Sequence, residues 1–272
     1  MFILIIWLQG IWLPLHGYTF TETPLWAGIY MLPLTVGMLI AGPTSGYLSD
    51  RFGARGFATG GMLVTAASFG LLMLLPIDFA YPMFAAVLGL TGLAMGMFAS
   101  PNRAAVMNSL PATDRGAGGG MNQTFQNSAQ VLSIGIFFTL MILGLAASLP
   151  STMQSGLLAH GVSHADATRL AHLPPVSILF AAFLGYNPIA HLLGPGALHA
   201  LAAHDRAVVT GPSFFPHLIS GPFKHGLHEA FAFAILACLV AAGASALRGS
   251  VTRAEPVRER AADAVAGGTP AR

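Results

Sequence analysis

The stretch GYLSDRFGAR, residues 46–55, is a short charged segment between two long apolar runs. No Asp, Glu, Lys or Arg occurs from Thr23 to Ser49, or from Gly56 to Ile77. A helix needs about 20 apolar residues to cross the hydrocarbon core of a membrane. The pattern therefore predicts two membrane-spanning helices that are joined by a tight turn at one membrane face.

Each charged residue of this turn has an expected place. Asp50 is expected to cap the following helix, because a carboxylate suits the positive N-terminal end of a helix. The glycines allow two helix ends to approach closely. Arg51 and Arg55 are expected at the cytoplasmic surface, because cytoplasmic loops carry an excess of Lys and Arg.

The composition extends the membrane assignment to the whole chain. Of its 272 residues, 54% are hydrophobic and only 8% are charged. A soluble domain has about 25% charged residues. The net charge of +2 comes from few charges and does not indicate nucleic-acid binding. A single cysteine, Cys238, excludes a disulfide within one chain.

Six apolar runs divide the chain. They predict helices at about 1–15, 25–46, 57–75, 83–100, 119–149 and 229–247. Residues 1–149 therefore hold five spans, 150–227 form an external loop with short interfacial helices, 228–249 hold the last span and 250–272 form a disordered cytoplasmic tail. The first run is too short to span comfortably, so we expect it to be truncated and the chain to be the back part of a longer protein.

The long loop has helix signals of its own. Ser163 and Asp166 have the spacing of a capping box, which predicts a short helix through Leu173. Residues 176–185 are apolar but too few to span, which favours an interfacial or re-entrant segment. Asn187-Pro188 can start another short helix.

The basic residues predict the orientation. Nine of the twelve Lys and Arg residues fall on the side of the charged turn and the tail. The positive-inside rule places that side in the cytoplasm. We expect a multi-pass protein of a bacterial inner membrane with a cytoplasmic C-terminus.

The turn also carries a resemblance. Its residues are similar to the G-x-L-x-D-R-x-G-x-R/K loop of the major facilitator superfamily of secondary transporters, at Gly46, Leu48, Asp50, Arg51, Gly53 and Arg55. The segments 17–18, 24–28, 32–33 and 101–102 resemble the C-terminal half of fourteen-helix drug:proton antiporters of the multidrug-resistance type. The resemblance implies an all-α, six-helix half of that fold with a long external loop before the last helix. It also implies that Asp50 is conformational, with Gly46, Arg51, Gly53 and Arg55, and binds no substrate.

The fifth predicted span contains the candidate substrate cavity. Five amides share one helical face there, because they repeat at intervals of three and four residues: Asn122, Gln123, Gln126, Asn127 and Gln130. Amides are costly in a membrane unless they meet water, a ligand or each other. Cavity lining is one interpretation, and hydrogen bonding between helices is the other.

Gln9 and Trp12 in the first span are further cavity candidates. An amide beside an aromatic ring suits a drug-sized apolar ligand, although a Trp near a membrane edge is also a common anchor. Gly92 and Gly96 form a G-x-x-x-G pattern, which favours close helix packing over a binding site.

The histidines suggest a possible metal site. Nine of the ten lie between His160 and His228. His225, His228 and Glu229 do not have the H-E-x-x-H order of zinc proteases, so we expect a surface loop and no metal. The chain has no cofactor fingerprint and no nucleophile motif, so we expect no cofactor, no catalytic residue and no enzyme.

These observations favour proton-coupled export of a hydrophobic small molecule or drug by alternating access, with this chain as the C-terminal half. The expected partners are the bilayer, the substrate, protons, and a missing N-terminal half or a second copy. No Asp or Glu lies deep in a predicted span, so the proton carrier is expected in the other half. The alternatives are an inactive truncated remnant and a membrane metalloprotein that uses the His-rich loop.

Overall fold

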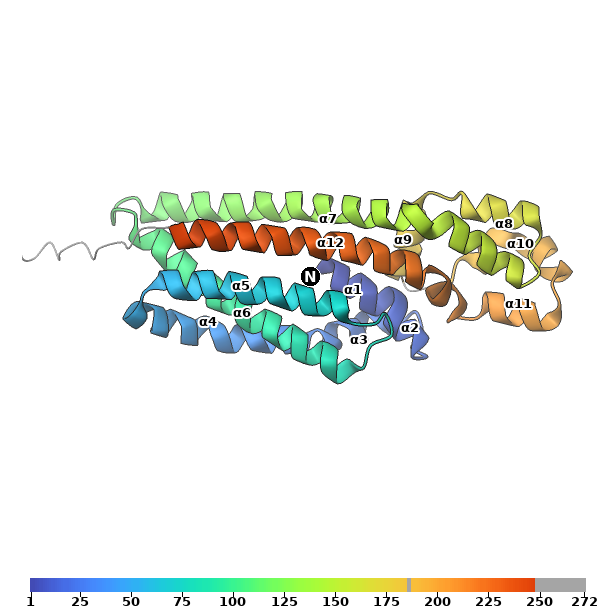
Figure 1. Ribbon diagram of the computed structural model, residues 1–272, viewed down its shortest axis with the longest axis horizontal. Coiled ribbons are helices and arrows are strands. Elements are labelled where there is room, and N and C mark those ends of the chain that lie inside the picture. Colours follow the sequence, from blue (N-terminus) through green and yellow to red (C-terminus); the bar gives the residue numbers. More distant parts are fainter. Residues whose placement is uncertain (185–186, 248–272) are drawn as a thin grey trace, which may run out of the picture.

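The computed structural model describes residues 1–184 and 187–247, and these residues form helices without a β-strand (Figure 1). The elements are α1 (Phe2–Trp7), the π-helix η1 (Leu8–Trp12), α2 (Leu13–Leu15), α3 (Thr23–Tyr30), α4 (Leu32–Phe52), α5 (Ala54–Leu74), α6 (Tyr81–Asn108), α7 (Arg115–Ala159), α8 (His164–Ala171), α9 (Pro175–Leu184), α10 (Ile189–Ala200), α11 (Ala203–Thr210) and α12 (Phe214–Leu247). The tail predicted at 250–272 lies outside the described residues.

The all-α membrane fold is confirmed. Five helices of the described chain are long and apolar enough to cross a membrane: Thr23–Phe52, Ala54–Leu74, Tyr81–Asn108, Arg115–Ala159 and Phe214–Leu247. A sixth span is counted if α8 and α9, which are bent by 86°, are taken together. The predicted first span is a shorter apolar helix, Phe2–Leu15, and it is buried among the others.

The charged turn is shorter than expected, because Gly53 alone separates α4 from α5. Gly53 has φ 93° and ψ 139°, a conformation that is essentially restricted to glycine. Its N–H donates to the carbonyl of Ser49 over 2.8 Å and closes α4. The predicted cap by Asp50 is wrong: α5 has no side-chain cap, because Asp50 still belongs to the last turn of α4.

Glycines on α6 bring it into backbone contact with α4. A Cβ on Gly92 would collide with the carbonyl of Leu34, and one on Gly96 would lie 2.7 Å from the Cβ of Ala41. The Ser45 hydroxyl donates to the carbonyl of Gly96 over 3.1 Å. The G-x-x-x-G pattern therefore serves helix packing, as predicted.

The last two long helices extend further than the sequence predicted. α7 continues through Pro150 to Ala159, and α12 begins at Phe214 instead of near Glu229. At 1.5 Å per residue, 45 residues give α7 a length of about 68 Å, twice the roughly 30 Å of a hydrocarbon core. The ends of α7 and α12 therefore project from the spans as a pair (Figure 1).

The projecting ends combine with α8–α11 into what we call the distal module, residues 150–184 and 187–227 (Figure 1). The predicted helix start at Ser163 is confirmed, because Ser163 Oγ accepts from the N–H of Asp166 over 3.1 Å. The Asp166 carboxylate accepts from the Ser163 hydroxyl. α8 ends at Ala171 and not at Leu173. Asn187 ties the module together by donating to the carbonyls of Val209 and Gly211, each over 2.8 Å.

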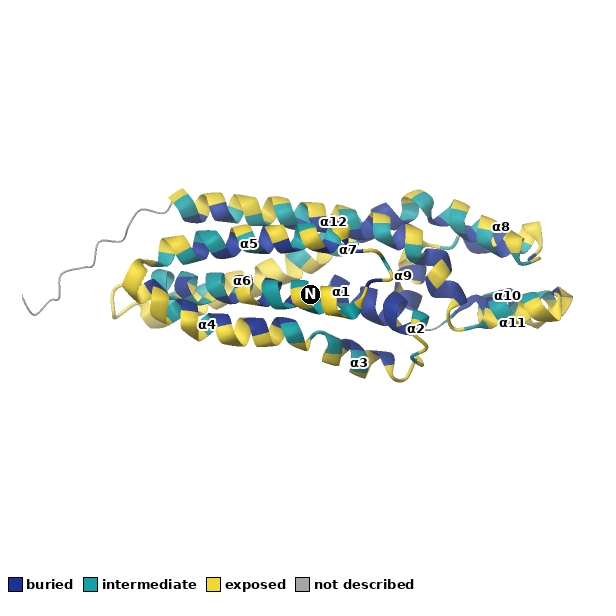
Figure 2. Cartoon of the chain, turned by 60° about the horizontal axis from the view of Figure 1, so that its bottom comes forward, coloured by how far each residue is buried: buried dark blue, intermediate teal, exposed yellow. Residues whose placement is uncertain are grey.

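α9 connects the distal module to the first helix. Its buried residues are Ile178, Leu179, Ala181 and Ala182. A Cβ on Gly10 in η1 would collide with the carbonyl of Ala182. Buried residues accordingly concentrate around α1, α2 and α9 in Figure 2. The segment predicted at 176–185 as interfacial or re-entrant is, over the described residues 176–184, part of a helix packed against η1.

The turn before α3 is closed by Thr19 and Glu22. The Glu22 carboxylate accepts from the Thr19 hydroxyl over 2.7 Å and from its N–H over 3.0 Å. These hydrogen bonds lower the pKa of Glu22. A lowered folded-state pKa means that this turn is stabilised above the ordinary glutamate pKa and loses that stabilisation as the pH falls.

Candidate functional site

Most of the amides on the predicted face of α7 are exposed. Asn122 is half-buried and the other four predicted amides are exposed. The side chain of Gln123 donates to Asn127 Oδ1 over 3.0 Å, one turn further along the helix. The first half of α7 therefore carries a row of amides that the described part of the chain leaves largely uncovered.

An aromatic cavity of about 550 Å³ lies between α1, α5, α6, α7 and α12, and we call it the phenylalanine cavity. It is lined by Met1, Phe2, Ile3, Leu4, Ile5, Phe69, Met95, Gln130, Ser133, Ile134, Phe137, Phe138 and Phe231. The rings of Phe2 and Phe138 lie 5.1 Å apart, and those of Phe69 and Phe231 5.7 Å apart. Within the described residues, only Gln130 and Ser133 bring polar side chains to this wall.

A second hollow of about 730 Å³ lies between α4, α6 and α7, and we call it the polar cavity. Its polar side chains are Ser100, Asn102, Arg103 and Gln126. Arg103 supplies a positive charge at the end of α6 that leads to α7. The two cavities therefore differ in chemistry, one aromatic and one polar.

Two of the five predicted amides reach these cavities. Gln126 lines the polar cavity and Gln130 lines the phenylalanine cavity. They lie four residues apart, so one face of α7 serves both hollows. Asn122, Gln123 and Asn127 do not line either cavity.

The two candidates from the first helix do not line the described cavities. Gln9 is buried in η1, with 8% of its surface exposed. Trp12 is buried as well, and its indole N–H donates to the carbonyl of Phe79 over 2.9 Å. Its ring stacks on Phe79 and on His16. Trp12 is therefore occupied by contacts within the fold.

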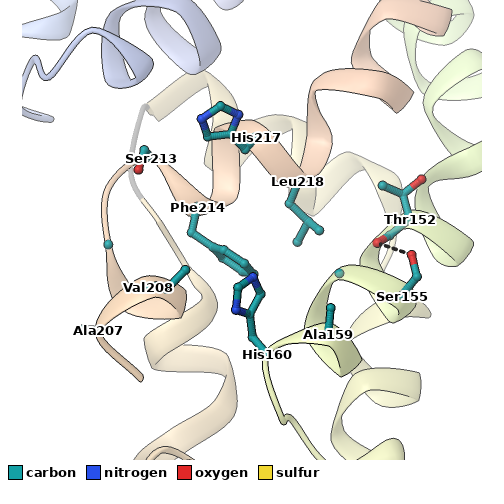
Figure 3. A pocket seen from close by; sticks show the side chains of 12 residues that line it. Thr152, Ser155, Ala159, His160, Ala207, Val208, Ser213, Phe214, His217 and Leu218 are labelled. Carbon is teal, nitrogen blue, oxygen red and sulfur yellow. Dashed lines mark hydrogen bonds between the residues drawn. The ribbon is translucent and has the colours of Figure 1, made fainter. Parts of the chain in front are cut away.

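A third cavity of about 550 Å³ lies in the distal module, the part of the chain that holds most of the histidines. Figure 3 shows His160 and His217 on either side of Phe214 on its wall. His160 Nδ1 lies 3.4 Å from Asp205 Oδ1, and this contact joins the end of α7 to α11. Histidine-rich composition was the only signal for it in the sequence.

The histidines do not assemble a metal centre in the described part of the chain. No group of three or more His, Cys, Asp or Glu side chains there could hold a metal ion. His228, one of the two singled out, places Nε2 3.1 Å from the carbonyl of Met73 and so joins α12 to α5.

The charged residues of the turn stay at the surface. Asp50, Arg51 and Arg55 are exposed, and the Arg51 guanidinium lies 5.7 Å from the ring centroid of Phe52. The three ion pairs found among the described residues all lie elsewhere. Gly46 faces α6, because a Cβ there would lie 2.9 Å from Ser100 Oγ.

The described part of the chain is a bundle of membrane-length helices with hollows between them. Residues 1–134, just under half of the chain, match the family model described as Major Facilitator Superfamily. This segment is therefore similar in sequence to that transporter family.

The curated relatives include resistance, export and transport proteins. The chain is 33% identical over 167 residues to the methyl viologen resistance protein SmvA of Salmonella typhimurium, covering 59% of this chain and 32% of the relative. It is 27% identical over 184 residues to the tetracenomycin C resistance and export protein of Streptomyces glaucescens, covering 66% and 33%. The riboflavin transporter RibZ of Clostridioides difficile is 29% identical over 115 residues, covering 42% and 25%. The chain thus spans at most about a third of these relatives. No solved structure matches it.

Proposed function

We propose that this chain is the C-terminal six-helix half of a major facilitator exporter that expels a hydrophobic small molecule in exchange for protons. The observation that carries the proposal is the α7 face on which Gln126 and Gln130 open into two adjoining hollows. In secondary transporters the substrate site lies near the bilayer midplane, between two repeats that rock against each other.

The exposed first half of α7 supports the proposal that another unit forms the opposite wall of the cavity. Exposed apolar side chains there include Phe125 and Val131, beside the exposed amides. A face with both kinds of side chain suits neither lipid alone nor water alone. We propose that an N-terminal six-helix half, or a second copy of this chain, covers it and completes the cavity.

The phenylalanine cavity supports the substrate class. Its volume of about 550 Å³ is within the usual range for drug-sized ligands. Phenylalanine faces attract cations as well as apolar groups, and the Gln130 amide offers one hydrogen-bonding position. A planar aromatic molecule, neutral or cationic, fits this wall, and the proteins that this chain resembles include resistance proteins for methyl viologen and tetracenomycin C.

Proton coupling needs a titratable group in the transport pathway. The candidate spans of this chain carry only two carboxylates, Asp50 at the end of α4 and Glu229 on α12, and both are exposed. We therefore place the proton carrier of the transport pathway in the other half.

Ligand binding tests the proposal directly. The purified full chain in lipid nanodiscs is expected to bind ethidium, a planar aromatic cation, and Phe138→Ala is expected to weaken binding about tenfold, which corresponds to about 1.4 kcal/mol. Isothermal titration calorimetry measures the affinity. Phe125→Ala is the matched control, because Phe125 is on the same helix, 66% exposed, and lines neither the phenylalanine nor the polar cavity. Equal losses in both variants would contradict the proposed cavity, and complete absence of binding would favour an inactive remnant.

The orientation has its own test. In the proposed topology the α4–α5 turn and the C-terminus face the cytoplasm of a bacterial cell. In a Cys238→Ser background, Arg51→Cys and Arg55→Cys are expected to react with a membrane-impermeant maleimide only after the cells are opened. Thr21→Cys, an exposed residue before α3, should react in intact cells. Labelling of Arg51→Cys in intact cells would show that the topology is the opposite of the proposed one.

A further inference from the structure

The first helix holds the loop between α5 and α6 at three consecutive residues. The indole N–H of Trp7 donates to the carbonyl of Ile77 over 3.1 Å. The indole N–H of Trp12 donates to the carbonyl of Phe79 over 2.9 Å. Between them, His16 Nε2 lies 3.6 Å from Asp78 Oδ1. We call these three contacts the clasp.

The π-helix explains how both indoles reach one loop. In a regular α-helix, residues five apart point about 140° away from each other around the axis. The segment Leu8–Trp12 is a π-helix, whose wider turn brings residues five apart closer to the same side of the axis. Trp7 and Trp12 therefore share a face, and the clasp depends on this local winding.

His16 differs from the two indoles because both of its ring nitrogens face oxygen atoms. Nδ1 lies 2.8 Å from the carbonyl of Trp12, and Nε2 faces the Asp78 carboxylate. A neutral imidazole has one N–H and one lone pair, whereas the imidazolium has two N–H groups. Only the protonated ring can donate at both positions. It also stacks on Trp12, with centroids 3.9 Å apart and planes 23° apart, and a cation is favoured on an indole face.

The elements packed around His16 bring no competing ion pair. In the described ranges, Asp78 is its single carboxylate partner within 4 Å. Glu22 beside α3 is bound by Thr19. The remaining titratable groups of the neighbouring segments are the hydroxyls of Tyr18, Tyr30 and Tyr81, and, on the part of α12 nearest this end, Lys224, His225, His228 and Glu229.

We propose that His16 is a proton-binding site at the distal end of the spans, and that its protonation closes the third point of the clasp on Asp78. In the proposed orientation this end faces the outside, which is the acidic side of an energised bacterial membrane. An acidic outer medium would then favour the His16–Asp78 contact between the first helix and the α5–α6 loop. A neutral medium would weaken that one contact. This inference does not require the chain to transport anything.

Tryptophan emission tests the proposal on the full chain. Trp26→Phe leaves Trp7 and Trp12 as the emitting residues, because the chain has three tryptophans. Emission is expected to fall in one step as the pH is lowered from 8 to 5, because a protonated imidazole stacked on an indole quenches it more than a neutral one, and histidine ordinarily titrates in this range. His16→Gln should lose the step.

His160→Gln is the matched control. His160 also faces a carboxylate, Asp205 at 3.4 Å, but its ring contacts Phe214 and not an indole. This variant should keep the step and its midpoint. His16 and Asp78 have side chains that are 39% and 66% exposed, so both can be replaced without disturbing the core, and circular dichroism checks the helix content. A parent protein without the step, or a step that survives His16→Gln, would overturn the proposal.

Discussion

Gly226→Leu is expected to separate α7 from α12 and to lower the free energy of unfolding by about 3 kcal/mol or more. A Cβ on Gly226 would lie 2.6 Å from the carbonyl of Met141, and one on Gly144 would lie 2.7 Å from the backbone nitrogen of Gly226. The obstacles are backbone atoms, so no side chain can rotate away. α7 and α12 would therefore have to move apart, and the ends of both helices belong to the distal module.

The same substitution in the same helix provides the control. Gly243 is exposed on α12, and a Cβ there would meet nothing within 4 Å. Gly243→Leu should leave stability unchanged or slightly raised, because leucine has the higher helix propensity. Thermal unfolding in detergent, followed by circular dichroism, compares the variants. Equal melting temperatures for Gly226→Leu and Gly243→Leu would show that the close approach of α7 and α12 does not hold in the protein.

The second large expected effect concerns uphill transport. We expect this chain alone to carry out none. Inverted membrane vesicles that contain only this chain as a monomer are expected to show no ethidium accumulation under an imposed proton gradient. The physical reason is that alternating access needs two units that rock around the site, and the proposal assigns this chain only one of them. Ethidium fluorescence measures accumulation, and chemical cross-linking measures the oligomeric state.

The outcomes of that assay separate the proposed partners. Accumulation that appears only when the chain is cross-linked as a dimer would identify a second copy as the opposite wall. Accumulation that appears only with a co-expressed N-terminal half would identify that half. Accumulation by a monomer alone would contradict the proposal that this chain forms half of the pathway.

The sequence predicted the spans well where charge bounded them. The α4–α5 turn was found from its charges, and its single linking residue, Gly53, was among the glycines singled out. The ends of α7 and α12 were missed because Pro150, Pro216 and Pro222 look like helix breakers. A proline is tolerated in such helices when neighbouring helices and local adjustments satisfy the freed backbone groups.

The candidate site was predicted in part. Periodicity placed five amides on one face, but only Gln126 and Gln130 line the hollows, because cavity walls depend on which helices lie opposite. Trp12 was read as a cavity residue, whereas its indole binds the α5–α6 loop. Nothing in the sequence shows that residues 12 and 79 meet, and no periodicity rule predicts the π-helix that makes the contact possible.

Only the φ and ψ angles of Gly53 lie between α4 and α5, which are helices of 21 residues each. Any change in the angle between α4 and α5 must be absorbed at this one pivot or by bending the helices themselves. Because α4 and α5 are both in backbone contact with α6, at Gly92 and at Gly61, a rigid-body motion at this end of the bundle would carry all three helices together.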